Sequence, residues 1–310
     1  MNVPLNPLVC PRCAAELHPR TGYPTQATCF EDCLRRCDAC GIGFSNGRHS
    51  QTRIHRNSLD NIPPEVMPGA EDALVNALNE DNRANKKLKF GFSSSEDALT
   101  WTVFSFLHAS GQLGRIVRGC GFVQDNVDEP AMLLWGVPHP AASVRGGPIR
   151  TRVIEICDRL GEKPRRRSEP DVILDFADDG LIIVEVKYRS GNDQQKFGEK
   201  HEKYLSDTDA FTELELIRHA ELYELTRNWR IGVELAEGRP FTLVNLMIKN
   251  KEPNQIRQFR SGLNYLKGNY RITTWRDFLS ECNPSEWPLW FKEYLDDKLP
   301  GMMPVLVEQP

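Results

Sequence analysis

The stretches EPDVILDF (residues 169–176) and LIIVEVK (residues 181–187) decide the fold of this chain. Each is a short apolar run, and the acidic, glycine-ended turn between them predicts two neighbouring strands of one sheet. Because side chains alternate along a strand, Glu185 and Lys187 leave the second strand on the same face. Ionised groups near a core are costly unless they are paired or bound to a metal. With Asp171 arriving from the first strand, the three charges therefore indicate a site.

The residue types of this site suit a divalent metal ion and a phosphate. Asp171 and Glu185 offer hard oxygen ligands of the kind that Mg²⁺ prefers, and the backbone carbonyl of Val186 is a further candidate ligand. An ammonium such as Lys187 beside the metal can orient a water or hydroxide and offset charge that develops on a phosphate. Among reactions, hydrolysis of a phosphodiester fits these parts best.

The pattern formed by Pro170, Asp171, Glu185 and Lys187 resembles the signature of the PD-(D/E)XK, or restriction-endonuclease-like, nuclease superfamily. The resemblance spans residues 90–250 and implies a mixed α/β fold with an αβββαβ core, and phosphodiester cleavage that depends on Mg²⁺ or Mn²⁺. By position, Asp171 and Glu185 would be the metal ligands and Lys187 the catalytic lysine. A bare D…ExK pattern is common by chance, but the apolar strands and an upstream helix strengthen this instance.

Many members of that superfamily add a glutamate from the first core helix, and Glu96 matches this position. A helix over residues 93–109 is predicted because Leu99, Val103 and Leu107 recur at helical spacing, and Glu96 falls on the same stripe. Its acidic start has two interpretations, a capping box begun by a preceding serine or a carboxylate of the site. We expect a catalytic role for Glu96, since so apolar a helix face rarely carries an unpaired charge.

The remaining core elements are predicted around the two strands. A helix at residues 149–160 precedes the site, a long helix at 211–229 follows it, and residues 240–248 read as another core strand. One more strand is expected within 115–122 or 131–137. Helix, strands, helix and strand is the order of an αβββαβ core.

Several basic or polar residues near these elements are candidates for contact with the substrate. A polar loop follows Lys187, a basic run directly precedes Asp171, and the helix at 211–229 carries an arginine among its apolar residues. The candidates are Arg166, Arg167, Arg189, Gln194 and Arg218. Each also has a plainer interpretation, as a solvated surface or, for the last, as a side chain that only passes the apolar edge.

A second motif lies at the N-terminus, where six of the nine cysteines fall within the first forty residues. Two C-x-x-C pairs, Cys10 with Cys13 and Cys37 with Cys40, have the form of zinc-ribbon knuckles, in which four thiolates surround a tetrahedral Zn²⁺. Disulfides and reactive thiols are the alternatives. We expect structural zinc, because a redox pair needs only one C-x-x-C and no secretory pattern is recognisable.

Two more cysteines, Cys29 and Cys33, lie between the knuckles. They could replace one knuckle or build a second site with His18 or His49, but we expect spare thiols packed near the ribbon. A ribbon this small cannot bury enough apolar surface to fold alone, so the metal must supply much of its stability. Its basic residues mildly favour nucleic acid as its contact, with a partner protein or the next domain as the alternatives.

The length of 310 residues leaves room for one substantial domain and an appendage, and 40% hydrophobic residues fit a globular protein. We expect a zinc ribbon at residues 1–50, a linker with a helical segment at 51–90, a nuclease core at 91–250 and a C-terminal extension at 251–310 that packs on the core. No apolar run approaches a membrane span, so we expect no membrane contact and a cytoplasmic location. The net charge of −4 leaves nucleic-acid binding to local basic patches.

The sequence thus predicts a Mg²⁺-dependent endonuclease that acts on DNA, with RNA as an open second substrate. By resemblance, restriction or phage defence is its expected role. A repair or junction-processing nuclease is one alternative. A catalytically silent module that binds nucleic acid or protein through the nuclease fold is another, although retention of all three site charges argues against it. A homodimer is expected if both strands of a duplex are cut.

Overall fold

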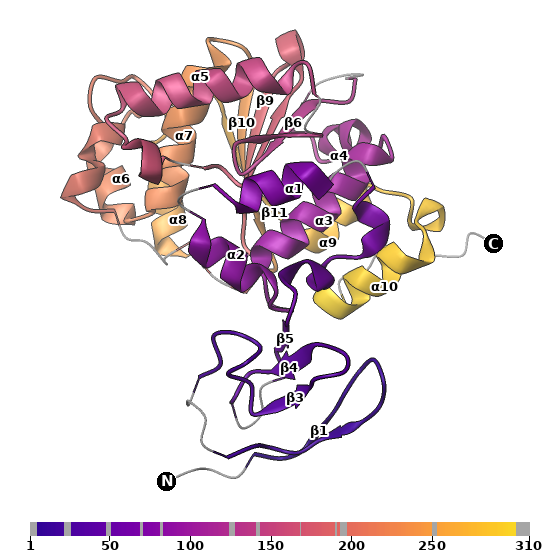
Figure 1. Cartoon of the computed structure of the whole chain (residues 1–310). Helices are drawn as coiled ribbons and strands as arrows, with labels where there is room; N and C mark the ends of the chain where they lie inside the picture. The colour runs from indigo at the N-terminus through magenta and orange to yellow at the C-terminus, as the bar shows by residue number, and fades with distance from the viewer. Residues whose placement is uncertain are drawn as a thin grey trace.

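The computed structural model of the chain describes residues 5–21, 26–47, 51–68, 71–80, 83–123, 128–140, 143–167, 169–189, 191–192, 197–249 and 253–301 (Figure 1). Within these residues, a larger body of helices around a sheet carries a smaller N-terminal unit of short strands. The mixed α/β class predicted from the sequence is confirmed. None of the helices in these ranges is long and apolar enough to cross a membrane.

The body is built on a six-stranded sheet in the order β11-β10-β9-β8-β6-β7. Its strands are β6 (Ala131–Leu134), β7 (Val137–His139), β8 (Val172–Asp175), β9 (Leu181–Val186), β10 (Phe241–Met247) and β11 (Asn269–Thr274). Strands β7, β6, β8 and β9 pair antiparallel, whereas β9, β10 and β11 run parallel to one another. The strands β6, β8 and β9 are buried at every residue, which explains why they read as continuous apolar runs.

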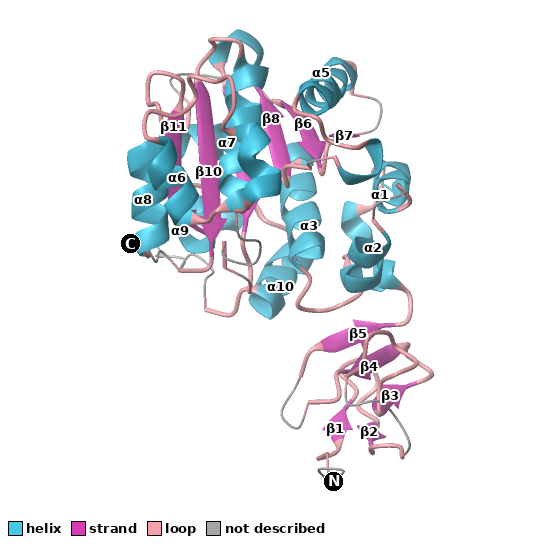
Figure 2. Cartoon of the chain, turned by 90° about the vertical axis from the view of Figure 1, so that its left-hand side faces the viewer, coloured by secondary structure: helices cyan, strands magenta, loops and turns pink. Residues whose placement is uncertain are grey.

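Helices cover both faces of this sheet (Figure 2). As predicted, the side chains of β9 alternate, with Ile182 and Val184 in one apolar core and Leu181 and Ile183 in the other. The helices that pack into the first core are α1 (Glu71–Leu78), α2 (Ala84–Phe90), α3 (Glu96–Ala109), α4 (Leu113–Gly119), α9 (Trp275–Ser280) and α10 (Leu289–Lys298). Those of the second core are α5 (Gly146–Arg159), α6 (Leu214–Ala220), α7 (Tyr223–Ala236) and α8 (Asn254–Gly262).

Short 3₁₀ turns connect several of these elements. They are η1 (Ser58–Asn61), η2 (Pro64–Val66), η3 (Pro164–Arg166), η4 (Ala177–Asp179), η5 (Glu199–Tyr204) and η6 (Pro284–Glu286). The hairpin between β6 and β7 turns at Trp135 and Gly136, whose φ angles of +50° and +72° match a two-residue turn of the primed type.

Three predicted elements differ from the structure. The long helix expected at 211–229 is divided, because Glu221 takes a left-handed conformation with φ +54° and ends α6 before α7 begins. The strand expected within 115–122 or 131–137 is β6 in the second range, and α4 occupies most of the first. The serine that caps α3 is Ser95, whose side chain accepts a hydrogen bond from Ala98 N, so no capping box with an earlier serine forms.

The region beyond residue 250 is integrated into the body. Strand β11 pairs with β10 over six residues, from Thr242 with Asn269 to Met247 with Thr274. Helices α9 and α10 contribute Phe278, Phe291 and other side chains to the first core. The boundary expected at residue 250 therefore falls between two neighbouring strands of one sheet.

The N-terminal unit contains two small sheets. Strands β3 (Arg35–Cys37), β4 (Ile42–Phe44) and β5 (Arg53–His55) form one, and β1 (Leu8–Val9) pairs with β2 (Glu16–Leu17) in the other. The unit buries few apolar residues. Those of its main cluster are Cys10, Leu17, Cys37, Ile42 and Phe44.

The N-terminal unit is joined to the body through β5. Ile54 pairs with Phe92 in a β-bridge, His55 N donates to Gly91 O at 2.9 Å, and Ser93 N donates to Arg53 O at 2.9 Å. Helix α3 begins directly after this segment. The pairing therefore ties the edge of the small sheet to the residues that lead into a helix of the body.

Candidate active site and metal centre

The predicted catalytic residues of β8 and β9 meet at the edge of the sheet where β9 ends. Because β8 is antiparallel to β9 and Val172 pairs with Val184, Asp171 lies at the level of Glu185. Val186 N donates to Asp171 Oδ2 at 2.8 Å, which fixes the carboxylate against the neighbouring strand. Strand pairing therefore brings the two acidic residues together.

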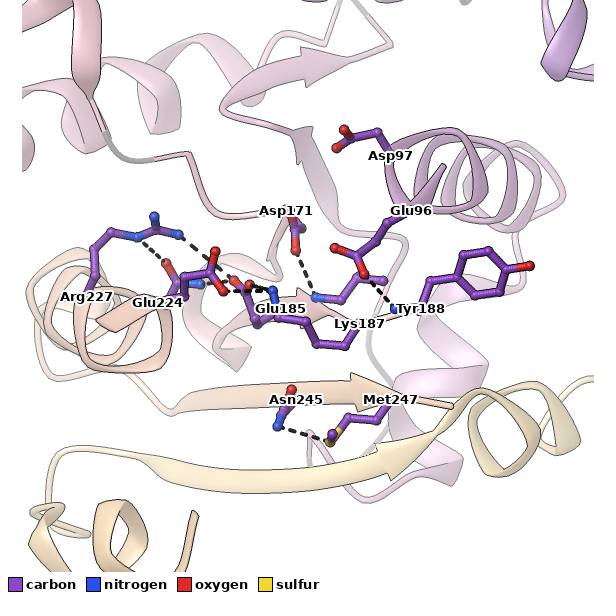
Figure 3. A network of polar contacts seen from close by, with 12 residues as sticks. Glu96, Asp97, Asp171, Glu185, Lys187, Tyr188, Glu224, Arg227, Asn245 and Met247 are labelled. Carbon is purple, nitrogen blue, oxygen red and sulfur yellow. Dashed lines mark hydrogen bonds and ion pairs between the residues drawn. The ribbon is translucent and has the colours of Figure 1, made fainter. Parts of the chain in front are cut away.

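The ammonium of Lys187 is anchored between two carboxylates (Figure 3). Its Nζ lies 2.6 Å from Glu185 Oε1 and 2.8 Å from Glu224 Oε2. The second oxygen of Glu185 accepts a hydrogen bond of 2.7 Å from Asn228 Nδ2. Glu185 and Lys187 are 3% and 4% exposed, so this is a buried polar network whose members satisfy one another.

Glu96 reaches the same end of β9 from the first turn of α3. Its Oε2 accepts a hydrogen bond of 2.6 Å from Tyr188 N, directly after the lysine. Figure 3 shows the carboxylates of Glu96 and Asp171 over the same stretch of chain, beside Lys187. The structure thus brings together all four residues predicted to be catalytic, Glu96, Asp171, Glu185 and Lys187, which we call the β9 cluster.

The charges of the β9 cluster are unevenly balanced. Burial and the charge of Glu185 raise the pKa of Asp171 well above its usual value. Burial also opposes ionisation of Glu185, but the charges of Lys187 and Arg227 outweigh it and hold the pKa of Glu185 below its usual value. Burial would lower the pKa of Lys187, but Glu185 and Glu224 raise it instead. The carboxylates thus outnumber the cations, and burial and the charge of Glu185 raise the pKa of both Asp171 and Glu224.

Three residues of the network were missed by the sequence analysis. Glu224, Arg227 and Asn228 project from α7 toward β9, and Arg227 Nη2 lies 3.9 Å from Glu185 Oε2. Their spacing of three and four residues on one helix was the available signal. The same spacing is also typical of a solvent-exposed polar helix face, so it does not by itself indicate a site.

A further buried polar residue lies beside Glu185 on β10. Asn245 pairs in register with Glu185, is fully buried and donates from Nδ2 to Met247 Sδ and Tyr270 Oη, each at 3.3 Å. A polar residue in the middle of an apolar strand was the sequence signal for it.

Two basic residues near the start of α2 support the segment before Asp171. Arg83 is 2% exposed, and its guanidinium binds Glu169 at 2.6 Å and the carbonyl of Trp135 at 2.5 Å. Trp135 N in turn donates to Asp171 O at 3.0 Å. Lys86 forms an ion pair with Asp97 and lies over the Trp135 ring, 4.4 Å from its centroid.

The predicted substrate-binding residues are dispersed, and the ion pairs of Arg218 lie away from the β9 cluster. Arg218 binds Glu202 at 2.9 Å and Glu215 at 2.5 Å on its own side of the body, and no contact joins it to the β9 cluster in the described chain. Arg167 pairs with Asp158 at 2.8 Å, and Arg189 is exposed just after Tyr188. The side chain of Arg166 and all of Gln194 lie outside the described residues.

The four cysteines of the two C-x-x-C pairs converge as predicted. The sulfur atoms of Cys10, Cys13, Cys37 and Cys40 all lie within 4.8 Å of one another, and all four are free thiols. Both turns are closed in the same way, since Ala14 N donates to Cys10 O and Gly41 N to Cys37 O, each at 2.9 Å. This four-thiol cluster fits a structural zinc ion.

The possible ligand atoms of the β9 cluster are less closely grouped than the sulfur atoms of the four-thiol cluster. Across the described ranges, the cysteines are the one group of three or more possible ligands whose ligand atoms all lie that close together. The carboxylate of Glu185 is instead turned toward Lys187 and Asn228.

The other two N-terminal cysteines lie outside the four-thiol cluster, as expected. Cys33 is fully buried, packs with Ala27 and Ile54, and donates from Sγ to Cys29 O at 3.4 Å. Burial raises the pKa of Cys33 to about 12, which keeps it a thiol. A Cβ on Gly43 would come within 2.6 Å of the Cys33 sulfur, so that glycine makes room for it. His18 pairs with Glu16 at the surface, and His49 lies outside the described residues.

Comparisons of the chain with protein-family models, with curated proteins and with solved structures find no match.

Proposed function

We propose that this protein is a metal-dependent nuclease with an active site of the PD-(D/E)XK type, and that it hydrolyses phosphodiester bonds in DNA. The observation that carries the proposal is the convergence of Glu96, Asp171, Glu185 and Lys187 at one end of β9. The order α3, β6, β8, β9, α7 and β10 also agrees with the αβββαβ order of that superfamily, with α4, β7, α5 and α6 as insertions.

Asp171 and Glu185 would hold the catalytic Mg²⁺ or Mn²⁺, with Glu96 as a third carboxylate beside them. Their chemistry fits, because both offer hard oxygen atoms and because burial and the charge of Glu185 raise the pKa of Asp171. A divalent cation relieves that repulsion. When bound, such an ion polarises a phosphate and lowers the pKa of a coordinated water.

Lys187 would donate hydrogen bonds to the phosphate or to the attacking water. Its ammonium is held by Glu185 at 2.6 Å and by Glu224 at 2.8 Å, so its position is set before a substrate arrives. Asn228 fixes the other oxygen of Glu185 at 2.7 Å. Donors oriented in advance stabilise developing charge without reorganising during the reaction.

The remaining parts of the proposal concern partners and setting. The four-thiol cluster would bind structural Zn²⁺, and the N-terminal unit would contact nucleic acid or a partner protein. Restriction or phage defence is the role that the resemblance implies, and a homodimer would present two sites to the two strands of a duplex. A reducing cytoplasm would keep the thiols available for metal.

The test is cleavage of plasmid DNA, single-stranded DNA and RNA by the purified full chain with Mg²⁺, Mn²⁺ or EDTA. Lys187→Ala is compared with Lys267→Ala, a matched change at the opposite end of the sheet, where Lys267 forms an ion pair with the exposed Asp209. We expect metal-dependent cutting that Lys187→Ala abolishes and Lys267→Ala leaves intact.

Each other outcome has a distinct meaning. Cutting at full rate by Lys187→Ala would contradict the assignment of the site. Tight binding of nucleic acid or protein without cutting under any metal condition would favour the catalytically silent module. Cutting confined to RNA would keep the site and correct the substrate.

A further inference from the structure

A cleft of about 660 Å³ lies between the N-terminal unit and the body. From the N-terminal unit it is lined by apolar residues of β1 and β4 and by the segment that enters β5, and from the body by three polar residues. The lining residues used below are Val9, Phe44, Arg53, Ser93, Arg189 and Asp297.

The cleft is continuous in sequence with the β9 cluster on both sides. Arg189 follows Lys187 by two residues, and Ser93 precedes Glu96 by three. The hydrogen bond of 2.6 Å from Tyr188 N to Glu96 joins these two chain segments between the cleft and the cluster. A nucleic-acid strand bound across the β9 cluster would therefore enter the cleft where it extends beyond the cluster.

The polar side chains that line the cleft, Arg53 from the N-terminal unit and Arg189 from the body among them, carry an excess of positive charge. Arg53 and Arg189 line it with one acidic residue, Asp297, which forms an ion pair with Arg53. The ammonium of Lys298 lies close by, and its pKa falls to about 7 because of burial and, in part, because of the charges of Arg53 and Arg189. The charges of the two arginines therefore both act on the ammonium of Lys298.

The residues that β1 and β4 contribute to the lining are apolar. Val9 on β1 is 60% exposed, and Phe44 on β4 is a further apolar residue of the lining. The guanidinium of Arg189 lies over the Tyr188 ring, 5.2 Å from its centroid, which restricts where it points. The arginines of the lining suit phosphates, and its apolar side chains suit sugars and bases.

The size of the cleft limits its occupant. Its volume is that of a pocket for a small ligand. A pocket of this volume holds a drug-sized ligand, which is far smaller than a segment of duplex. A few nucleotides of one strand fit.

We propose that this cleft holds a single-stranded segment of the nucleic acid substrate next to the scissile phosphate, with Arg53 and Arg189 contacting its phosphates. The inference rests on the proposed nuclease function and adds the path of the strand and the part of the N-terminal unit that contacts it.

The test measures binding of a fluorescent single-stranded oligonucleotide by the full chain in EDTA, over a range of salt concentrations. The variant Arg53→Gln with Arg189→Gln is compared with Arg257→Gln, an exposed arginine on α8 whose guanidinium donates to Asn254 in its own helix. We expect the double variant to bind about tenfold or more weakly. Its slope of log affinity against log salt should fall by about 1.4, or about 0.7 for each lost phosphate contact.

A second variant separates binding from folding, since Arg53 also pairs with Asp297 at the junction. Val9→Glu places a carboxylate in the cleft from an exposed side chain and breaks no ion pair. It should weaken binding of the oligonucleotide while zinc content and unfolding temperature stay unchanged.

The outcomes distinguish this inference from the proposed function. If the wild-type chain cuts and binds nucleic acid but the cleft variants bind equally well, the path through the cleft is wrong and the nuclease stands. If only duplex binding falls, the single-stranded occupant is wrong. If the wild-type chain neither cuts nor binds nucleic acid, the proposed function fails and this inference fails with it.

Discussion

The two clusters of possible metal ligands in this protein are held in opposite ways. The four thiols lie within 4.8 Å of one another in a unit with few buried apolar residues. The β9 cluster lies at the edge of a sheet with a large core on each face, and its members are held by Asn228, Glu224 and backbone amides. In the N-terminal unit a metal would organise the fold, whereas in the body the fold organises the site.

The ligand chemistry follows the same division. Thiolates in a small unit bind zinc tightly enough to stabilise it, so their positions depend on the metal. Loosely bound Mg²⁺, as proposed for the β9 cluster, cannot stabilise a fold in this way, so the strands and α7 must place the carboxylates. The predictions below test this difference, from the largest expected effect to the smallest.

Asp171→Asn should lower the rate of cleavage by about a thousandfold or more, because it removes a metal ligand and the negative charge that attracts the ion. The fold should persist, since the amide oxygen can still accept the hydrogen bond from Val186 N. Initial cleavage rates and thermal unfolding measure the two effects. Asp178→Asn, at an exposed turn, is the matched control and should cut normally. A large loss of unfolding temperature in Asp171→Asn would show that the site stabilises the body.

Cys37→Ser should abolish zinc binding and unfold the N-terminal unit, because binding of structural zinc supplies on the order of 10 kcal/mol to so small a unit. The body should stay folded, because it has a large apolar core on each face of its sheet. Zinc content and amide hydrogen exchange check this, with fast exchange expected in β3 and β4 and protection retained in β9 and β10.

The matched control for that variant is Cys33→Ala. Cys33 packs against Ala27 and Ile54 and lies outside the four-thiol cluster, so zinc should remain and stability should fall by only about 1 kcal/mol. Equal loss of zinc in the two variants would mean that the cluster is assigned incorrectly.

Glu224→Gln should reduce cleavage by about ten- to a hundredfold, less than Asp171→Asn, since it loosens one of two anchors of Lys187 and removes no proposed metal ligand. Steady-state rates should show the loss in kcat and little change in KM. Glu155→Gln, exposed on α5, serves as control. Unchanged kcat in Glu224→Gln would leave Glu185 as the sufficient anchor of the lysine.

Acid should destabilise the body through His139. Burial, with a smaller effect of His108, lowers the pKa of His139 to about 4 from 6.5, so the folded state keeps the ring neutral while the unfolded chain binds a proton. The free energy of unfolding is then highest above pH 6.5 and falls as the pH drops to 4, by up to about 3 kcal/mol.

Urea unfolding at pH 7.5 and pH 5 measures this loss. His139→Gln should reduce the difference between the two pH values, and His219→Gln, at an exposed position, should leave it as it is. The same pH dependence in all three chains would exclude His139 as its source.

Arg218→Gln should change cleavage and oligonucleotide binding by less than about twofold, because its guanidinium pairs with Glu202 and Glu215 and not with the β9 cluster. The free energy of unfolding of this variant should fall by about 0.5 kcal/mol or less. Weakened binding in this variant would place the substrate path across α6 instead of the cleft.

Local patterns predicted what depends on neighbours in the chain. The apolar runs of β8 and β9, the helical spacing of α3 and the two C-x-x-C pairs are each complete within a few residues, and the structure contains all of them. The proximity of Asp171, Glu185 and Lys187 also followed, because strand alternation and a short connection leave little choice of geometry.

Other features could not be predicted from the sequence, because they depend on contacts between residues that are distant in the chain. The left-handed Glu221 divides one predicted helix into two, although no glycine marks the break. In the sequence, the positions of Glu224, Arg227 and Asn228 are those of an ordinary polar helix face. Their role depends on the packing of α7 against β9, which brings them to Lys187 and Glu185. The place of β11 in the central sheet depends on its pairing with β10.

The sequence by itself thus determined the class of the fold and which residues form the two clusters. These depend on periodicity, spacing and ligand type, which are properties of short segments. Only the tertiary structure decided which helix completes the network around Lys187, and that β5 joins the N-terminal unit to the segment before Glu96. The physical reason is that contacts between distant segments arise from the packing of whole faces, and no single segment carries the pattern of its partner.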